Sequence, residues 1–153
     1  MADKHMRIVN LQPMRVISFN GFGESPEGQA LDKLFNWSLS HHKTGRVFGF
    51  NNPNPSLGSP DYGYEVWMTV DPEIEVSDEA RVVDFPGGQY AVLRCSVRHP
   101  WEDIPGAWQR LVSWLESSEY QRAPHQWLEE HLDPENAKEG DNFALDLYLP
   151  IQE

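Results

Sequence analysis

At 153 residues, 39% of them hydrophobic and 24% charged, the chain has the length and composition of one globular domain that can bury a core. Its 24 acidic and 12 basic residues give a formal net charge of -12, which repels nucleic-acid phosphates and argues against direct DNA or RNA binding. No stretch reaches the roughly 18 apolar residues of a membrane span, and residues 1–10 lack the apolar core of a signal peptide. With a single cysteine, Cys95, these features predict a cytoplasmic protein with no membrane partner.

Two segments have the apolar spacing of amphipathic helices. The first is predicted over residues 25–42, with Ser25 as the cap and Pro26 in the first turn. The second is predicted over residues 103–116, with Pro105 near its start. The apolar stripes consist of Ala30, Leu31, Leu34, Phe35 and Leu39 in the first segment, and of Ile104, Trp108, Leu111, Val112 and Leu115 in the second.

Short runs with strand character, separated by turn-forming clusters such as 51–55 and 84–88, surround the two helices. Strands are predicted at residues 14–19, 46–50, 64–70, 90–97, 127–132 and 143–149. The order strand, helix, strand, strand therefore occurs twice. Short matches support a duplication, because LFNW at 34–37 is similar to LVSW at 111–114, and YEVW at 64–67 aligns with LDLY at 145–148. We therefore expect one α+β domain over residues 1–153, with pseudo-repeats at about 8–75 and 82–152.

Successive side chains of a strand point to opposite faces, so each predicted strand can be divided into a core face and a second face. The core faces are apolar, as in Leu145, Leu147 and Leu149. The second faces combine large aromatic residues with acids and one histidine. Their members are Trp67, Tyr90, Trp127, Tyr148, Glu65, Glu129, Asp146 and His131.

Aromatic rings and carboxylates together suit an organic cation, because the rings offer cation–π contacts and the acids offer charge complementarity. We therefore predict a ligand site in which Glu129 and at least two of the four aromatic residues line one cavity. The alternative is that the second faces are the wet side of an antiparallel sheet, where polar and aromatic residues also occur without a ligand.

Several motifs resemble those of the GyrI-like effector-binding domains, the ligand-sensing halves of AraC-type and MerR-type regulators that also occur as free-standing proteins. Together they extend over nearly the whole chain. They are LFNW at 34–37, VFG at 47–49, GGQYAV at 87–92, the segment 108–114, LEEHL at 128–132 and LYLPI at 147–151.

The resemblance implies a duplicated βαββ fold, with a curved antiparallel sheet, both helices on one face and a ligand cleft between the halves. It also implies bulky aromatic or cationic ligands. The family's cleft glutamate corresponds to Glu129, and the aromatic residue that follows it, usually tyrosine, corresponds to His131.

Three functions are compatible with this sequence, and the first is favoured. It is a stand-alone protein that senses or sequesters aromatic or cationic compounds. The second is a cofactor-independent hydrolase of strained electrophilic toxins, with Glu129 as the base assisted by Tyr90 or Tyr148. The third is an interaction protein that modulates DNA gyrase or serves a separate regulator. No metal or other cofactor is expected, because the histidines lack metal-ligand spacing.

Overall fold

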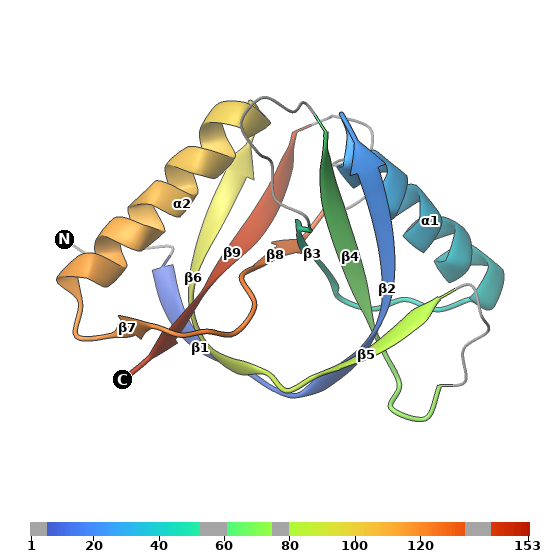
Figure 1. Ribbon diagram of the computed structural model, residues 1–153, viewed down its shortest axis with the longest axis horizontal. Coiled ribbons are helices and arrows are strands. Elements are labelled where there is room, and N and C mark those ends of the chain that lie inside the picture. Colours follow the sequence, from blue (N-terminus) through green and yellow to red (C-terminus); the bar gives the residue numbers. More distant parts are fainter. Residues whose placement is uncertain (1–5, 53–60, 75–79, 134–141) are drawn as a thin grey trace. The chain divides into compact units, whose positions relative to one another are not determined.

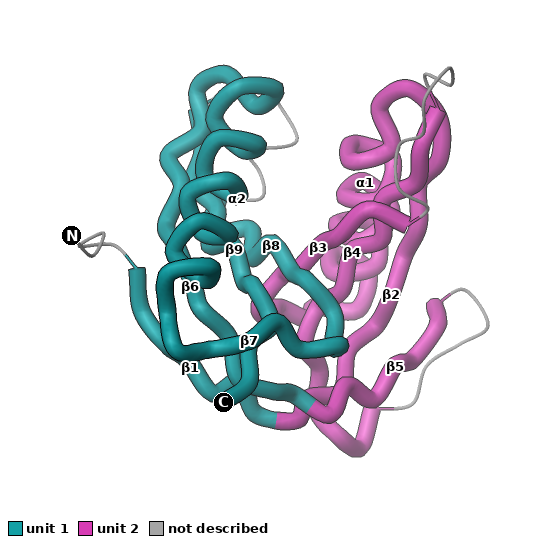
Figure 2. The backbone as a smooth tube through the Cα atoms, turned by 60° about the vertical axis from the view of Figure 1, so that its left-hand side comes forward, with its two compact units in different colours: residues 1–12, 87–153 teal, residues 13–86 magenta. Residues whose placement is uncertain are grey.

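Two helices and nine strands form the described part of the chain, which is shown here as a computed structural model (Figure 1). The described residues are 6–52, 61–74, 80–133 and 142–153. They divide into two compact units (Figure 2). Unit 1 contains residues 1–12 and 87–153, and unit 2 contains residues 13–86.

In its described residues, unit 2 is an antiparallel sheet with the strand order β3-β4-β2-β5. Helix α1 packs against β2 and β4 and covers one face of this sheet (Figure 1). The elements are β2 (Met14–Gly23), α1 (Pro26–His41), β3 (Val47–Asn51), β4 (Tyr62–Val70) and β5 (Arg81–Phe85).

Unit 1 repeats this plan, with the strand order β1-β6-β9-β8 and the short strand β7 also paired with β9. Helix α2 packs against β6 and β9. Its buried residues join those of β6 and β9 in one apolar cluster that includes Leu93, Leu111 and Leu147. The elements are β1 (Met6–Leu11), β6 (Gly88–Val97), α2 (Pro100–Ser117), β7 (Gln121–Arg122), β8 (Leu128–His131) and β9 (Phe143–Gln152).

The predicted α+β class is confirmed, and the repeated order of strand, helix, strand, strand is seen in β2-α1-β3-β4 and, apart from the two-residue β7 between α2 and β8, in β6-α2-β8-β9. Strands β1, β5 and β7 were missed. Strand β5 includes Asp84 and Phe85, which the sequence reading placed in a turn. The two longer strands among these pair with strands that are distant in the sequence: β1 pairs with β6, and β5 pairs with β2.

Helix α1 differs from its prediction in two details. Ser25 stands at the N-cap but its side chain makes no capping hydrogen bond, and Leu39 is 75% exposed instead of buried. Trp37 takes the expected place of Leu39 in the core. The reason is the helical period: Trp37 lies three residues after Leu34 and on its face, whereas Leu39 lies five residues after it and about 140° away.

Helix α2 begins three residues earlier than predicted, because Pro100 occupies its first turn. Pro105 therefore lies inside the helix and not at its start. The described residues include no helix long and apolar enough to cross a bilayer.

We expect Cys95 to react slowly with iodoacetamide in the native protein. Its side chain is 3% exposed beneath α2, and its Sγ lies 3.6 Å from the carbonyl oxygen of Asp103. Burial, helped by the Asp103 charge, raises the pKa of the thiol, and the thiolate is the reactive form. Alkylation followed by mass spectrometry should be at least about tenfold slower in native than in urea-unfolded protein. Equal rates would contradict the buried position.

Candidate functional site

Each sheet has one face covered by its helix and one face turned away from it, here called the non-helical face. In unit 2 Gly21 identifies the helical side, because a Cβ built on it would lie 2.2 Å from the carbonyl oxygen of Pro26 in α1. Directly paired residues share a face, and Gly21 pairs with Tyr64. The next residue of β4, Glu65, therefore lies on the non-helical face together with Trp67, as predicted.

Glu65 is a buried carboxylate with an unusually complete set of donors. Its Oε2 accepts hydrogen bonds from Ser18 Oγ at 2.7 Å, Trp67 Nε1 at 2.6 Å and Arg81 Nη2 at 2.8 Å. Its Oε1 accepts one from Asn52 Nδ2 at 3.0 Å. Burial opposes ionisation of Glu65, but these hydrogen bonds and the Arg81 charge outweigh it and lower the pKa of the carboxyl. The side chain is therefore held as an anion.

Trp67 extends this acid into an aromatic cluster. Its ring centroid lies 5.0 Å from that of Phe50 in an edge-to-face arrangement, and 5.3 Å from that of Phe85. Trp67 is 5% exposed, so most of its ring surface already contacts protein. On the non-helical face of unit 2, an indole, two phenyl rings and the exposed side chain of Arg81 thus surround the Glu65 carboxylate.

The matching acid of unit 1 is Asp146 on β9. Arg94 donates to its Oδ1 at 2.5 Å and to its Oδ2 at 3.3 Å, and Arg7 donates to Oδ2 at 2.7 Å. Burial again opposes ionisation, but the two guanidinium groups prevail and lower the pKa of Asp146. The arginines are 43% and 47% exposed in their side chains, whereas Asp146 is 2% exposed.

A phenol–carboxylate pair lies beside this ion pair. The hydroxyl of Tyr148 donates a hydrogen bond of 2.6 Å to Oε1 of the buried Glu130. The ring of Tyr90 meets that of Tyr148 edge to face, with centroids 5.4 Å apart. Burial and the neighbouring Tyr148 raise the pKa of Tyr90, so its hydroxyl stays protonated. The predicted residues Tyr90, Tyr148 and Asp146 therefore share the non-helical face of unit 1 with Glu130.

The two acids that bind arginine occupy equivalent places in the two units. In each unit one arginine comes from an edge strand: Arg81 on β5 binds Glu65, and Arg7 on β1 binds Asp146. In each unit the acid lies two residues before the aromatic side chain of the central strand. The alignment of the tetrapeptides at 64–67 and 145–148 thus extends to side-chain contacts.

Sequence comparison identifies the family of the chain. The model of Cass2, the integron-associated effector binding proteins, matches residues 7–151. The chain belongs to this family. Comparison with curated proteins gave no significant match.

Solved structures resemble this Cass2-family protein over nearly its whole length. A hydrolase encoded by lin2189 of Listeria innocua has a TM-score of 0.71 at 11% identity, covering 98% of this chain and 93% of that one. The integron cassette protein VCH_CASS2 of Vibrio cholerae has a TM-score of 0.57 at 14% identity, covering 97% of each chain. SAV2435 bound to tetraphenylphosphonium has a TM-score of 0.54 at 11% identity, with 96% and 93% covered. At identities this low, the structural similarity establishes a shared fold and nothing more.

The sequence reading placed Glu129 and His131 on the wrong face of their strand. Glu129 lies opposite Leu147 and His131 opposite Leu145, and both leucines belong to the core beneath α2. A shift of one residue in strand pairing moves every side chain to the other face. The burial of His131 lowers its pKa to about 4, against the opposing effect of the Glu130 charge, so its imidazole is neutral at pH 7.

Trp127 also lies on the helical side, where it accompanies Glu129. Its ring centroid is 5.2 Å from that of Trp108 on α2, and Trp108 Nε1 donates to Glu129 Oε2 at 3.4 Å. The guanidinium of Arg122 lies 5.1 Å from the centre of the Trp127 ring. Glu129 therefore does not share a face with Tyr90 or Tyr148, and it contacts a tryptophan that the sequence reading assigned to the core.

Glu130 is the residue that sequence reasoning missed. The doublet of Glu129 and Glu130 contained the signal, because two consecutive acids in a strand place one carboxylate on each face in any register. The arginines on β1 and β5 were missed because those strands were not predicted. Arg94 lies in the predicted strand at 90–97, but its pairing with Asp146 depends on the neighbouring strand β9.

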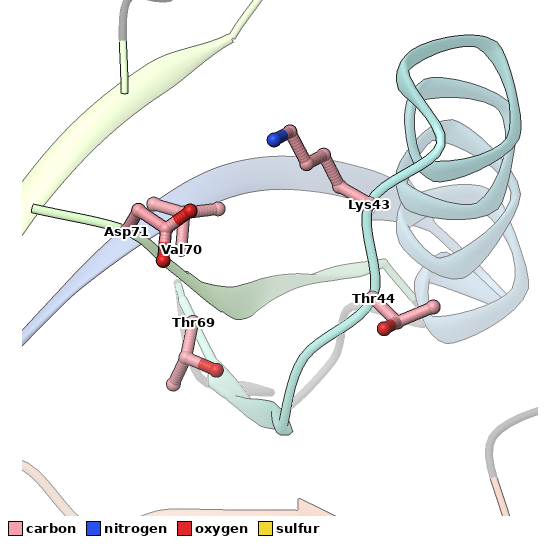
Figure 3. Close-up of a pocket in the computed structure, with 5 residues that line it drawn as sticks. All are labelled: Lys43, Thr44, Thr69, Val70 and Asp71. Atoms are coloured by element: carbon pink, nitrogen blue, oxygen red, sulfur yellow. The ribbon is translucent and has the colours of Figure 1, made fainter. Parts of the chain in front are cut away.

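A shallow hollow of about 210 Å³ lies elsewhere on unit 2, where α1 leads into β3 and β4 ends. It is lined by Lys43, Thr44, Thr69, Val70 and Asp71 (Figure 3). None of the predicted site residues lines it. Its lining is polar and lacks aromatic side chains, so it does not have the composition expected of a site for bulky aromatic compounds.

Proposed function

We propose that this protein binds a small organic ligand that is aromatic and cationic, and that residues of the non-helical face of unit 1 recognise it. The observation that carries the proposal is the contact of Tyr148 with the buried Glu130, beside the ring of Tyr90. Aromatic rings and a carboxylate suit such a ligand, because both attract a cation and do so more strongly in a buried, low-dielectric environment. SAV2435, which shares the fold, was solved with the lipophilic aromatic cation tetraphenylphosphonium.

We assign recognition of the ligand's charge to Glu130, because its carboxylate lies beside the two tyrosine rings. Glu130 is buried and accepts a hydrogen bond from the Tyr148 hydroxyl, and the Tyr148 ring meets that of Tyr90 edge to face. A ligand cleft between the halves and a partner such as gyrase or a separate regulator stay predictions.

The adjacent glutamates offer a matched test, since Glu130→Gln and Glu129→Gln make the same chemical change on opposite faces of one strand. We expect Glu130→Gln to weaken binding of tetraphenylphosphonium about tenfold, close to 1.4 kcal/mol, because it removes a desolvated charge. Glu129→Gln should change the affinity by less than about twofold. Isothermal titration calorimetry on both variants measures this. The reverse pattern would return the role to Glu129, and no change in either would remove both from the site.

The same contact supports a second candidate, hydrolysis of a strained electrophile. A carboxylate at 2.6 Å from a phenol could orient and deprotonate water while the phenol protonates the leaving oxygen. The protein encoded by lin2189, which shares the fold, is described as a hydrolase. Styrene oxide provides a probe, with diol formation followed by chromatography. Catalysis predicts that Glu130→Gln retains binding and loses turnover, whereas a pure binding protein gives no diol above the uncatalysed rate.

A further inference from the structure

Five residues of unit 1 form a bulge at the edge of β9. Strands β7 and β8 pair with the same strand, Arg122 lying opposite Ile151 and Leu128 opposite Tyr148. Between these two pairs, β9 has only residues 149 and 150, whereas the segment that joins β7 to β8 has the five residues 123–127. The surplus residues cannot continue the strand, so they leave its line.

Part of this bulge lies against the aromatic pair of the non-helical face. The ring of His125 stands edge to face on Tyr90, with centroids 4.8 Å apart and an interplanar angle of 88°. The Tyr90 hydroxyl donates to the carbonyl oxygen of Gln126 at 2.6 Å. His125 Nε2 lies 2.9 Å from the carbonyl oxygen of Gln89, and since a carbonyl only accepts, that nitrogen carries the proton.

Strand β6 is shaped to receive this imidazole. A Cβ built on Gly88 would lie 2.8 Å from His125 Nε2, closer than real Cβ atoms approach. Gly88 also has φ +156, a conformation that L side chains rarely adopt. Any other residue at this position would displace the ring. The position of the His125 ring is therefore determined both by Gly88 in β6 and by the bulge to which His125 belongs.

We propose that His125 occupies the ligand's own subsite and that a planar aromatic compound bearing N–H donors displaces it. This rests on the proposed function, because it places the ligand beside Tyr90 and Tyr148. The imidazole is itself a small aromatic ring with an N–H donor, and it meets a ring and a carbonyl acceptor there. When the bulge lifts, the carbonyl oxygen of Gln89 loses its donor and the Tyr90 hydroxyl loses its acceptor, so both groups on β6 favour a ligand that supplies replacements.

The ligand class follows from what the displaced ring leaves behind. The subsite offers the Tyr90 ring and hydroxyl, the carbonyl oxygen of Gln89 and, next to Tyr148, the Glu130 carboxylate. Aromatic amidines and protonated amino-heterocycles match this set, since they combine a flat ring with several donors and a positive charge. Uncharged hydrocarbons and aromatic carboxylates lack the donors and should bind poorly.

Benzamidine is the probe, and His125→Ala is the decisive variant. Removing the internal competitor should raise benzamidine affinity about tenfold over the native protein, because the binding-competent state no longer has to be opened. His99→Ala is the matched control, as His99 is exposed and precedes α2 in the same unit. It should leave the affinity unchanged. Tyr90→Phe keeps the ring but frees Gln126, so it should raise affinity a few-fold and serves as a second variant if His125→Ala unfolds.

A readout on the native protein complements the variants. Titration with benzamidine should shift the imidazole resonances of His125 in NMR spectra and leave those of His99 in place. Equal or weaker benzamidine binding by His125→Ala and Tyr90→Phe would overturn the displacement proposal, while tetraphenylphosphonium binding by the native protein would leave the proposed function standing. If neither the native protein nor any variant binds either compound, both proposals fall.

Discussion

Glu65→Gln is expected to lower the free energy of unfolding by about 3 kcal/mol at pH 7. The carboxylate is 2% exposed and all its neighbours are donors. A glutamine of the same shape offers these donors one neutral oxygen in place of two charged ones, so the charge-assisted hydrogen bonds of the carboxylate become neutral ones or are lost. The loss of charge facing Arg81 adds little, because that arginine is 64% exposed.

Urea denaturation followed by tryptophan fluorescence measures the effect, and Glu73→Gln is the control. Glu73 is exposed in the connection after β4, so the same substitution there should change stability by less than about 0.5 kcal/mol. A small effect at both positions would mean that water replaces the donors of Glu65 in the native state, and the buried network would then have no structural role.

The same carboxylates fix the direction of the pH dependence. The folded pKa values of Glu65 and Asp146 lie below their ordinary values of 4.5 and 3.8. Between the folded and unfolded pKa values the unfolded state binds more protons, so stability rises with pH there. The stabilisation is complete above about pH 4.5 and is lost as the pH falls through the folded values. Glu65→Gln should reduce the loss of stability that the native protein shows as the pH falls below about 4.5. An unchanged pH dependence of stability would contradict the depressed pKa of Glu65.

Gly21→Ala is expected to cost about 3 kcal/mol, because β2 and the start of α1 are in direct contact at this glycine. The added Cβ would lie 2.2 Å from the carbonyl oxygen of Pro26 and 2.9 Å from the Cβ of Gln29. The first of these atoms is backbone, so relief requires the N-terminus of α1 to move off the sheet. Thermal and urea unfolding should both show the loss.

Gly28→Ala is the control for this substitution. Gly28 lies within α1, and a Cβ built on it meets nothing within 4 Å. Alanine should therefore stabilise the helix by about 0.5–1 kcal/mol. Opposite signs at two glycines seven residues apart would identify packing, and not helix propensity, as the cause. Destabilisation by both would indicate that α1 does not pack on β2 as described.

Local periodicity determined much of this fold. The helices and the six predicted strands follow from patterns within single segments, and so does the placement of Glu65, Trp67 and Tyr148 on the faces turned away from the helices. In β4 and β9 the apolar residues alternate cleanly, so the core face can be read from the sequence. The repeated acid and aromatic residues of these strands were visible for the same reason.

Strand β8 shows where this reading stops. It has four residues, Leu128 is fully buried on the non-helical face opposite Tyr148, and Glu130 beside it is buried as well. With burial on both sides, the apolar pattern does not say which face belongs to the core. Its register with β9 decided that, and put Glu130 rather than Glu129 beside the tyrosine. Likewise, only long-range pairing joined Arg7 to Asp146 and Arg81 to Glu65, because the edge strands that carry these arginines are stabilised by partners far away in the sequence and not by their own composition.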